Sequence, residues 1–206
     1  MTTANRLVVG ISGASGAIYG VRLLEALRSL PVETHLVMSR TAEMTLAYES
    51  ERKPAAVRAL ADVAYGINDM GAALASGSFR TMGMAVAPCS IRSMSEIATG
   101  VTSNLLTRAA DVTLKERRRL VLMVRETPLH EGHLKNLLTL AELGAVIAPP
   151  VPALYALPAT VADIIDHTVG RILDLFGIET GLVKRWGEPR PEPQAVKEGV
   201  KRRPKG

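Results

Sequence analysis

Residues 7–27 read LVVGISGASGAIYGVRLLEAL, and this stretch decides the fold class. It opens with a five-residue apolar run, 7–11, which has the length and the near-continuous apolarity of a strand buried on both faces. A turn rich in glycine and serine follows, and apolar side chains then recur at helical spacing from residue 17 onward. We therefore expect a strand, a tight turn and a helix, the first unit of a parallel sheet covered by helices.

The same pattern repeats along the chain. Further strands are expected at 34–38, 84–87, 120–124 and 145–148. Helices are expected at 17–29, 41–50, 55–62, 92–100, 104–118, 133–143 and 160–176. These β-α-β repeats predict an α/β fold, a doubly wound parallel sheet in three layers, with a ligand at the carboxyl ends of its strands. We expect a single domain over residues 1–186, followed by a basic, proline-rich tail at 187–206 that is disordered.

Composition excludes several classes of protein. Hydrophobic residues at 47% and charged residues at 22% are ordinary for a globular chain, which argues against a fibre or a disordered protein. Seven aromatic residues leave little for base stacking, and the tail carries three of the five net positive charges, so no nucleic-acid partner is expected. Cys89 is the only cysteine, so no intrachain disulfide can form and a reducing compartment fits.

Two uncharged runs imitate membrane signals. The run 7–21 contains four glycines and continues into an amphipathic helix, unlike a signal peptide. The run 145–162 is 18 residues long, but Pro149, Pro150, Pro152 and Pro158 would break a spanning helix. We expect a cytoplasmic protein with no membrane segment.

The loop GISGASGA at residues 10–17 lets the backbone approach an anion, with the next helix offering free N–H groups and its positive dipole end. It matches neither the dinucleotide fingerprint nor the P-loop, and a plain tight turn remains the alternative. Met38-Ser39 stand where a dinucleotide site would have an acidic residue. A mononucleotide such as FMN, or a sugar phosphate, fits better.

Four motifs together carry a family resemblance: this loop, PCSIRS at 88–93, RAADVTLKERR at 108–118 and VRETPLH at 124–130. With them the chain resembles the UbiX family of flavin prenyltransferases from about residue 7 to 186. The resemblance implies a Rossmann-like flavoprotein fold related to the cysteine decarboxylases, and a homododecamer. It implies metal-independent transfer of a dimethylallyl group from dimethylallyl phosphate to N5 and C6 of reduced FMN. The prenylated FMN then serves a UbiD-type decarboxylase of aromatic acids, as in ubiquinone biosynthesis.

The resemblance also implies site residues. Its FMN site falls on Gly13, Ala14, Ser15, Ser39, Ser90, Ile91, Arg92, Ser93 and Arg125. Its prenyl-phosphate site falls on Arg108, Lys115, Tyr155 and Arg171. Its catalytic group falls on Ser15, the carboxylates Glu49 and Glu126, and Trp186, and no metal site is implied.

Cations suit the departure of an allylic phosphate, because the leaving group gains negative charge. The sequence has no Asp-Asp pair to hold magnesium, so fixed cations would have to neutralise that charge. Arg108 and Lys115 lie seven residues apart and share a helix face, and with Tyr155 and Arg171 they could surround one phosphate. The alternative is a solvated face on which Asp111 pairs with both cations.

The catalytic candidates also have plain alternatives. Burial of Glu49 would raise its pKa into a useful range, but from the sequence alone an exposed carboxylate at a helix end, beside Glu51, is the favoured alternative. Arg125 and Glu126 end a strand expected to be buried, where unused charges would be costly. Ser15 could bond the flavin near N5 or cap a helix, and Trp186 could shield an allyl cation or merely dock the C-terminus.

Other residues are weaker candidates. His130 and His133 resemble a zinc motif with wrong spacing and no third ligand, Cys89 is expected to be a buried strand-end residue, and His35 and His167 are expected on surfaces. Rival functions are a flavin-dependent cysteine decarboxylase, whose Met-Asn motif is missing here, and a non-catalytic flavin carrier. Direct decarboxylation of an aromatic acid by this chain is a third.

Overall fold

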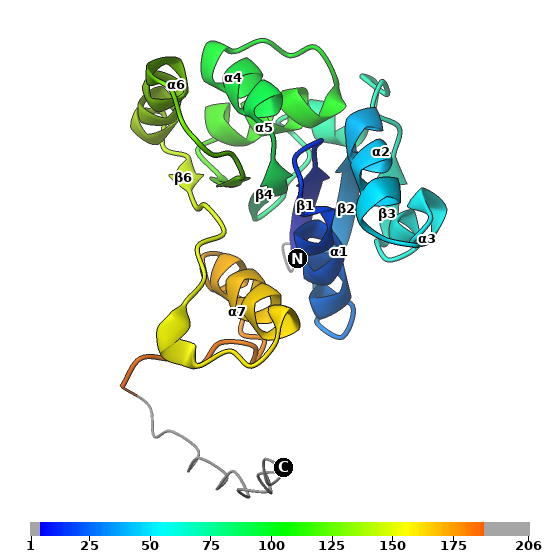
Figure 1. Cartoon of the computed structure of the whole chain (residues 1–206). Coiled ribbons are helices and arrows are strands. Elements are labelled where there is room, and N and C mark those ends of the chain that lie inside the picture. Colours follow the sequence, from blue (N-terminus) through cyan, green and yellow to red (C-terminus); the bar gives the residue numbers. More distant parts are fainter. Residues whose placement is uncertain (1–4, 188–206) are drawn as a thin grey trace, which may run out of the picture.

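A computed structural model describes residues 5–187 as a parallel sheet with helices on both faces (Figure 1). The strands pair in the order β3-β2-β1-β4-β5-β6, and every pairing is parallel. Their bounds are β1 Arg6–Ile11, β2 Glu33–Met38, β3 Val63–Tyr65, β4 Gly83–Cys89, β5 Arg119–Val124 and β6 Val146–Ile147. The five expected strands are all present, so the fold class read from the sequence is confirmed. The edge strand β3 was not expected.

The helices also lie close to their expected positions. Their bounds are α1 Ala17–Leu27, α2 Arg40–Glu49, α3 Pro54–Arg58, α4 Ile91–Thr99, α5 Leu105–Lys115, α6 Glu131–Glu142 and α7 Val161–Asp174, with short 3-10 turns η1 Ala73–Ala75 and η2 Leu154–Ala156. Polar side chains begin several of them. The hydroxyl of Ser39 accepts the N–H of Ala42 at the start of α2, and that of Ser90 accepts the N–H of Ser93 at the start of α4. These caps satisfy N–H groups that the first helical turn leaves without partners.

Two hydrophobic cores fill the two sides of the sheet. One joins α1 and α7 to the sheet, through side chains such as Leu24 and Leu173. The other joins α4 and α5 to the opposite face, through side chains such as Met94 and Leu106. Residues on α5 and residues on α7 are therefore separated by the thickness of the sheet.

The chain leaves the sheet after β6 and forms the yellow-to-orange part of Figure 1. It passes through η2 and α7, which packs against α1, and then returns over α7 as the C-terminal segment, residues 177–187. The return is close: a Cβ on Gly170 would lie 2.6 Å from Cγ2 of Val183. The expected disordered tail, apart from Gly187, lies outside the described residues, and the domain boundary at 186 stays a prediction.

No helix between residues 5 and 187 combines the length and apolarity needed to cross a bilayer. The uncharged run 145–162 forms β6, an irregular stretch and η2 before its last two residues begin α7, so it is not one continuous helix, as its prolines indicated.

Candidate active site

The carboxyl ends of the strands surround a first cavity of about 530 Å³. It is lined by six of the nine residues expected to bind the cofactor, namely Gly13, Ser39, Ser90, Ile91, Arg92 and Ser93. They come from the glycine loop and from the starts of α2 and α4, which follow β1, β2 and β4. Parallel strands bring these three sequence regions to one edge of the sheet.

A second cavity of about 470 Å³ lies next to the first. It is lined by Ser15, Tyr19, Arg125 and Glu126, together with the prolines that follow β6. Glu126 lines both cavities, so the two adjoin at its side chain. Of the nine expected cofactor residues, only Ala14 lines neither cavity, and it is buried in the loop between them.

Gly13 explains how the loop fits so closely against α2. A Cβ at this position would lie 2.4 Å from both Cβ and Oγ1 of Thr41, a distance that real Cβ atoms do not tolerate. Glycine therefore allows the backbone of the loop to reach the wall of the first cavity.

Glu49 reaches back to the glycine loop from the last position of α2. The N–H of Gly16 donates to both of its carboxylate oxygens, at 3.0 and 2.9 Å, and the N–H of Ala17 donates at 3.1 Å. These contacts decide one alternative and correct one expectation. Glu49 is exposed at the end of α2, as the favoured alternative had it. The expectation that the N–H groups at the start of α1 are free for an anion is wrong for Gly16 and Ala17, because both donate to Glu49. The contact places the carboxylate beside Ser15.

Ser15 does not cap α1, because Gly16 occupies the N-cap position and the N–H groups of Gly16 and Ala17 donate to Glu49 instead. The capping alternative for Ser15 is therefore wrong. Its exposed side chain lines the second cavity instead.

Arg125 and Glu126 lie just beyond the end of β5 and are both exposed. The strand that they follow is buried as expected, but the argument that unused charges at its end would be costly fails because both side chains are exposed. Arg125 faces Tyr19: burial raises the pKa of that phenol, and the positive charge of Arg125 partly offsets the rise. The oxygen Oε1 of Glu126 accepts the N–H of Thr127 at 2.9 Å.

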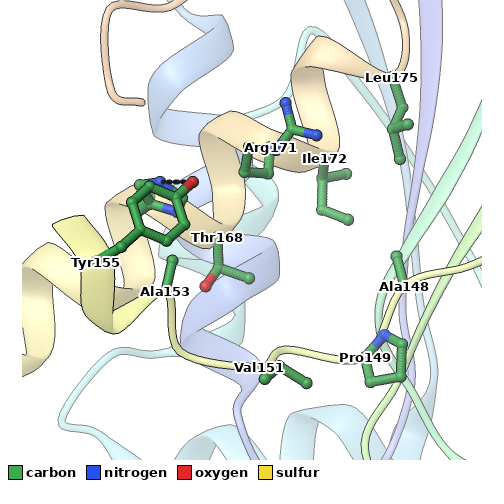
Figure 2. A pocket seen from close by; sticks show the side chains of 10 residues that line it. Ala148, Pro149, Val151, Ala153, Tyr155, Thr168, Arg171, Ile172 and Leu175 are labelled. Atoms are coloured by element: carbon green, nitrogen blue, oxygen red, sulfur yellow. Dashed lines mark hydrogen bonds between the residues drawn. The ribbon is translucent and has the colours of Figure 1, made fainter. Parts of the chain in front are cut away.

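The expected phosphate ligands fall into two groups. Tyr155 and Arg171 line a third cavity of about 280 Å³ between α7 and the irregular stretch after β6. Figure 2 shows Tyr155 and Arg171 at this cavity, with Pro149 and Val151 across from them. Arg108 and Lys115 lie on α5, on the opposite face of the sheet. Within one chain, the four residues are not brought together.

The two cations on α5 are already paired within the chain. Nη1 of Arg108 donates to Asp111 at 2.5 Å, and its Nε donates to the carbonyl of Ala75 at 3.2 Å. Nζ of Lys115 donates to Glu116 at 2.5 Å. The expected alternative pairing with Asp111 is therefore right for Arg108 and wrong for Lys115.

Trp186 stacks edge-on against Tyr155, with ring centroids 5.4 Å apart. Its side chain is 76% exposed within one chain. Trp186 thus lies next to Tyr155, which lines the third cavity together with Arg171.

The remaining candidates behave as ordinary residues. His130 accepts the N–H groups of Gly132 and His133 at the start of α6, and no group of three metal-binding side chains occurs among residues 5–187. Cys89 is fully buried, and burial raises the pKa of its thiol to about 12. His35 and His167, expected on surfaces, are both buried, which corrects that expectation.

Sequence reasoning missed three residues that touch the expected site. Glu96 lines the first cavity and accepts bonds from Nε of Arg92 (2.9 Å) and the hydroxyl of Ser103 (2.6 Å). His167 and Asp174, both on α7, contact the expected phosphate ligands Tyr155 and Arg171. The four-residue spacing from Arg92 to Glu96 could have indicated the first of these pairs.

Comparison with known proteins agrees with this geometry. Residues 1–173 match the Flavoprotein family. The chain is 55% identical over 181 residues to the flavin prenyltransferase UbiX of Thauera aromatica, covering 88% of this chain and 93% of that protein. The chain belongs to the UbiX family of flavin prenyltransferases.

Solved structures of UbiX proteins share the architecture. The crystal structure of AnUbiX (PadA1) in complex with FMN and dimethylallyl pyrophosphate superposes with a TM-score of 0.88 at 53% identity, covering 90% of this chain and 99% of that one. A dodecameric FMN-dependent Ubix-like decarboxylase from Escherichia coli O157:H7 gives a TM-score of 0.87 at 49% identity, covering 89% and 100%. The cysteine decarboxylase TvaF shares the fold alone, at 17% identity and a TM-score of 0.58 over 71% and 90% of the two chains. The chain is thus far more similar in sequence to UbiX proteins than to this cysteine decarboxylase, which argues against the rival function of cysteine decarboxylation.

Proposed function

We propose that this chain transfers a dimethylallyl group from dimethylallyl phosphate to N5 and C6 of reduced FMN, and that the product serves a UbiD-type decarboxylase. The observation that supports this most is the pair of adjoining cavities, whose walls carry eight of the nine residues expected to bind FMN.

The residues of these cavities fit FMN. The first cavity offers the hydroxyls of Ser39, Ser90 and Ser93 and the guanidinium of Arg92, which suit a phosphate and its ribityl chain. Together the cavities have the size typical of small-molecule sites. Bound there, reduced FMN supplies electron-rich ring positions that an allyl carbon can join.

Proton movement falls to the carboxylates and Ser15. Glu49 is bonded to the N–H of Gly16, and Gly16 and Ser15 line the second cavity, so its carboxylate is held next to that cavity. We assign it removal of the C6 proton or delivery of a proton to the leaving phosphate. Glu126, at the junction of the cavities, is the second candidate for the same task.

The leaving phosphate is gripped by cations and a phenol, without a metal. Arg171 and Tyr155 come from one chain, whereas Arg108 and Lys115 lie across the sheet from them. All four can meet one phosphate only if different copies of the chain contribute them. We therefore propose a homo-oligomer, a dodecamer like the E. coli relative, in which the donor site is completed between copies. Its place is the cytoplasm, and no nucleic acid or membrane takes part.

The decisive experiment is an anaerobic incubation of the protein with reduced FMN, dimethylallyl phosphate and EDTA. The released flavin should gain the mass of one five-carbon isoprene unit and a changed absorbance spectrum. A parallel reaction with dimethylallyl pyrophosphate tests which donor is used. An unchanged flavin that still binds one per chain would instead identify a carrier. Release of carbon dioxide from an aromatic acid without a partner protein would identify a decarboxylase.

A further inference from the structure

One face of α7 contacts the C-terminal segment through His167, Gly170 and Asp174. His167, Gly170, Arg171 and Asp174 are spaced at i, i+3, i+4 and i+7, which places them on the same side of a helix. At Gly170 the segment approaches so closely that a side chain would collide with Val183. This face therefore joins a residue of the proposed donor site, Arg171, to the segment that ends in Trp186.

Asp174 lies at the centre of this junction. Its side chain is 13% exposed, and its Oδ2 accepts Nη1 of Arg171 at 2.7 Å. It also receives a two-pronged bond from Arg185, with Nη1 at 3.0 Å from Oδ2 and Nη2 at 3.1 Å from Oδ1. Burial alone would raise the pKa of Asp174, but the bonds and charges of Arg185 and Arg171 lower it below its ordinary value. The carboxylate is thus held ionised between the two arginines.

Asp174 is in an unfavourable place for the helix itself. It is the last residue of α7, where the helix dipole is negative and a carboxylate destabilises the end. An acidic residue there gains nothing from helix formation, so its favourable contacts are those with Arg171 and Arg185.

His167 makes a second tie on the same face. Its Nε2 lies 3.3 Å from the hydroxyl of Tyr155 and 3.4 Å from the carbonyl of Lys184. Nζ of Lys184 in turn donates to the carbonyl of Ala156, next to Tyr155, at 3.2 Å. The residues just before Trp186 are therefore fixed both to α7 and to the turn that carries Tyr155.

We propose that Asp174 is a positioning residue for prenyl transfer, which aims Arg171 at the donor phosphate and fixes the segment carrying Trp186 beside Tyr155. The inference rests on the proposed function for the roles of Arg171 and Trp186. Arg171 is half exposed, and a guanidinium on a free side chain would sample many rotamers. One of the five N–H donors of the Arg171 guanidinium bonds Asp174. This bond fixes the plane of the guanidinium, so that its other donors point to the third cavity.

The test compares Asp174→Asn with Asp166→Asn in the full-length protein. Asp166 also lies on α7 and receives a two-pronged bond from an arginine, Arg22 of α1 (2.6 and 3.3 Å), but it does not contact the proposed site residues. Two quantities are measured. One is the KM for dimethylallyl phosphate with reduced FMN saturating. The other is the fluorescence anisotropy of Trp186, which is the only tryptophan in the sequence and so reports on the segment alone.

For Asp174→Asn we expect the KM for dimethylallyl phosphate to rise about ten- to a hundredfold and the anisotropy of Trp186 to fall. Asp174→Glu, which keeps the charge, should recover most of both. Asp166→Asn should lower the melting temperature while leaving both quantities unchanged. If Asp174→Asn, like Asp166→Asn, lowers only the melting temperature and leaves the KM and the anisotropy unchanged, Asp174 contributes an ordinary ion pair and the inference is overturned.

Two outcomes separate this inference from the proposed function. If the wild-type protein makes no prenylated flavin, the proposed function fails, and the anisotropy alone decides whether Asp174 fixes the segment. If Asp174→Asn does not fold, Arg185→Gln takes its place, because it leaves the bond from Arg171 to Asp174 intact. It should lower the anisotropy with a smaller rise in KM, and an unchanged anisotropy would overturn the inference.

Discussion

Glu49→Gln separates a catalytic carboxylate from a carboxylate that merely closes the glycine loop. In the wild type, three contacts join the Glu49 oxygens to the N–H groups of Gly16 and Ala17. A glutamine can turn its single oxygen to the position of Oε2, keeping the contacts at 2.9 and 3.1 Å and losing the one at 3.0 Å and the charge. The structural cost is then similar to the loss of a helix cap, about 1 kcal/mol, or about 2–4 °C in Tm for a domain of this size.

Loss of a general acid or base has a different magnitude, roughly two to four orders of magnitude in rate. The assay is anaerobic prenylation of reduced FMN at saturating dimethylallyl phosphate, followed by absorbance and mass, with FMN affinity titrated separately. We expect a large fall in rate, a small fall in Tm and unchanged FMN affinity. Glu43→Gln is the control, because Glu43 also lies on α2 but pairs with Arg58 away from the cavities. A Glu49→Gln protein with wild-type rate and lowered Tm would limit Glu49 to the loop and transfer its role to Glu126.

Three further results are expected. FMN should titrate to one per chain whether or not EDTA is present, because hydroxyls and Arg92 line its cavity; loss of binding with EDTA would contradict the site. Lys115→Met should lower kcat/KM for dimethylallyl phosphate by roughly ten- to a hundredfold, whereas Glu116→Gln, which removes only its partner, should not; equal kinetics would exclude Lys115 from the donor site. Cys89 should resist iodoacetamide at pH 8 until the protein is denatured, because its thiol is buried with a pKa of about 12, and alkylation of the folded protein would refute that placement.

The sequence predicted the sheet well because its strands are buried on both faces. Strands β1, β4 and β5 appear as nearly continuous apolar runs, a pattern that few other structures produce. In β2 only the second half, Leu36–Met38, is such a run. The edge strand β3 spans only Val63–Tyr65 and is partly exposed, so it leaves no such run. It pairs with β2 alone, and that pairing is decided by the rest of the fold.

The candidate site was predicted in part for the same reason. The residues at strand ends were expected together because parallel strands end at one edge of a sheet, and the first cavity confirms this grouping. The bond from Glu49 to Gly16 spans 33 residues and left no local signal. Helical spacing showed that Arg108 and Lys115 share a face of α5, but it could not show which face of the sheet α5 covers. Arg108 and Lys115 are separated from Arg171 because α5 and α7 cover opposite faces of the sheet.

The residues of the third cavity are close together in the sequence, and this affects how the proposed preference for one prenyl donor could change during evolution. Tyr155, Arg171 and Trp186 all come from the unbroken stretch 148–187, whereas the first cavity is assembled from loops scattered between residues 13 and 126. In the proposed function, binding of FMN thus depends on the whole sheet, whereas the half of the proposed donor site formed by Tyr155, Arg171 and Trp186 is encoded by one contiguous part of the gene. A single recombination event near residue 148 would exchange it as a block, together with the prolines that line the second cavity, and leave the first cavity of the recipient in place.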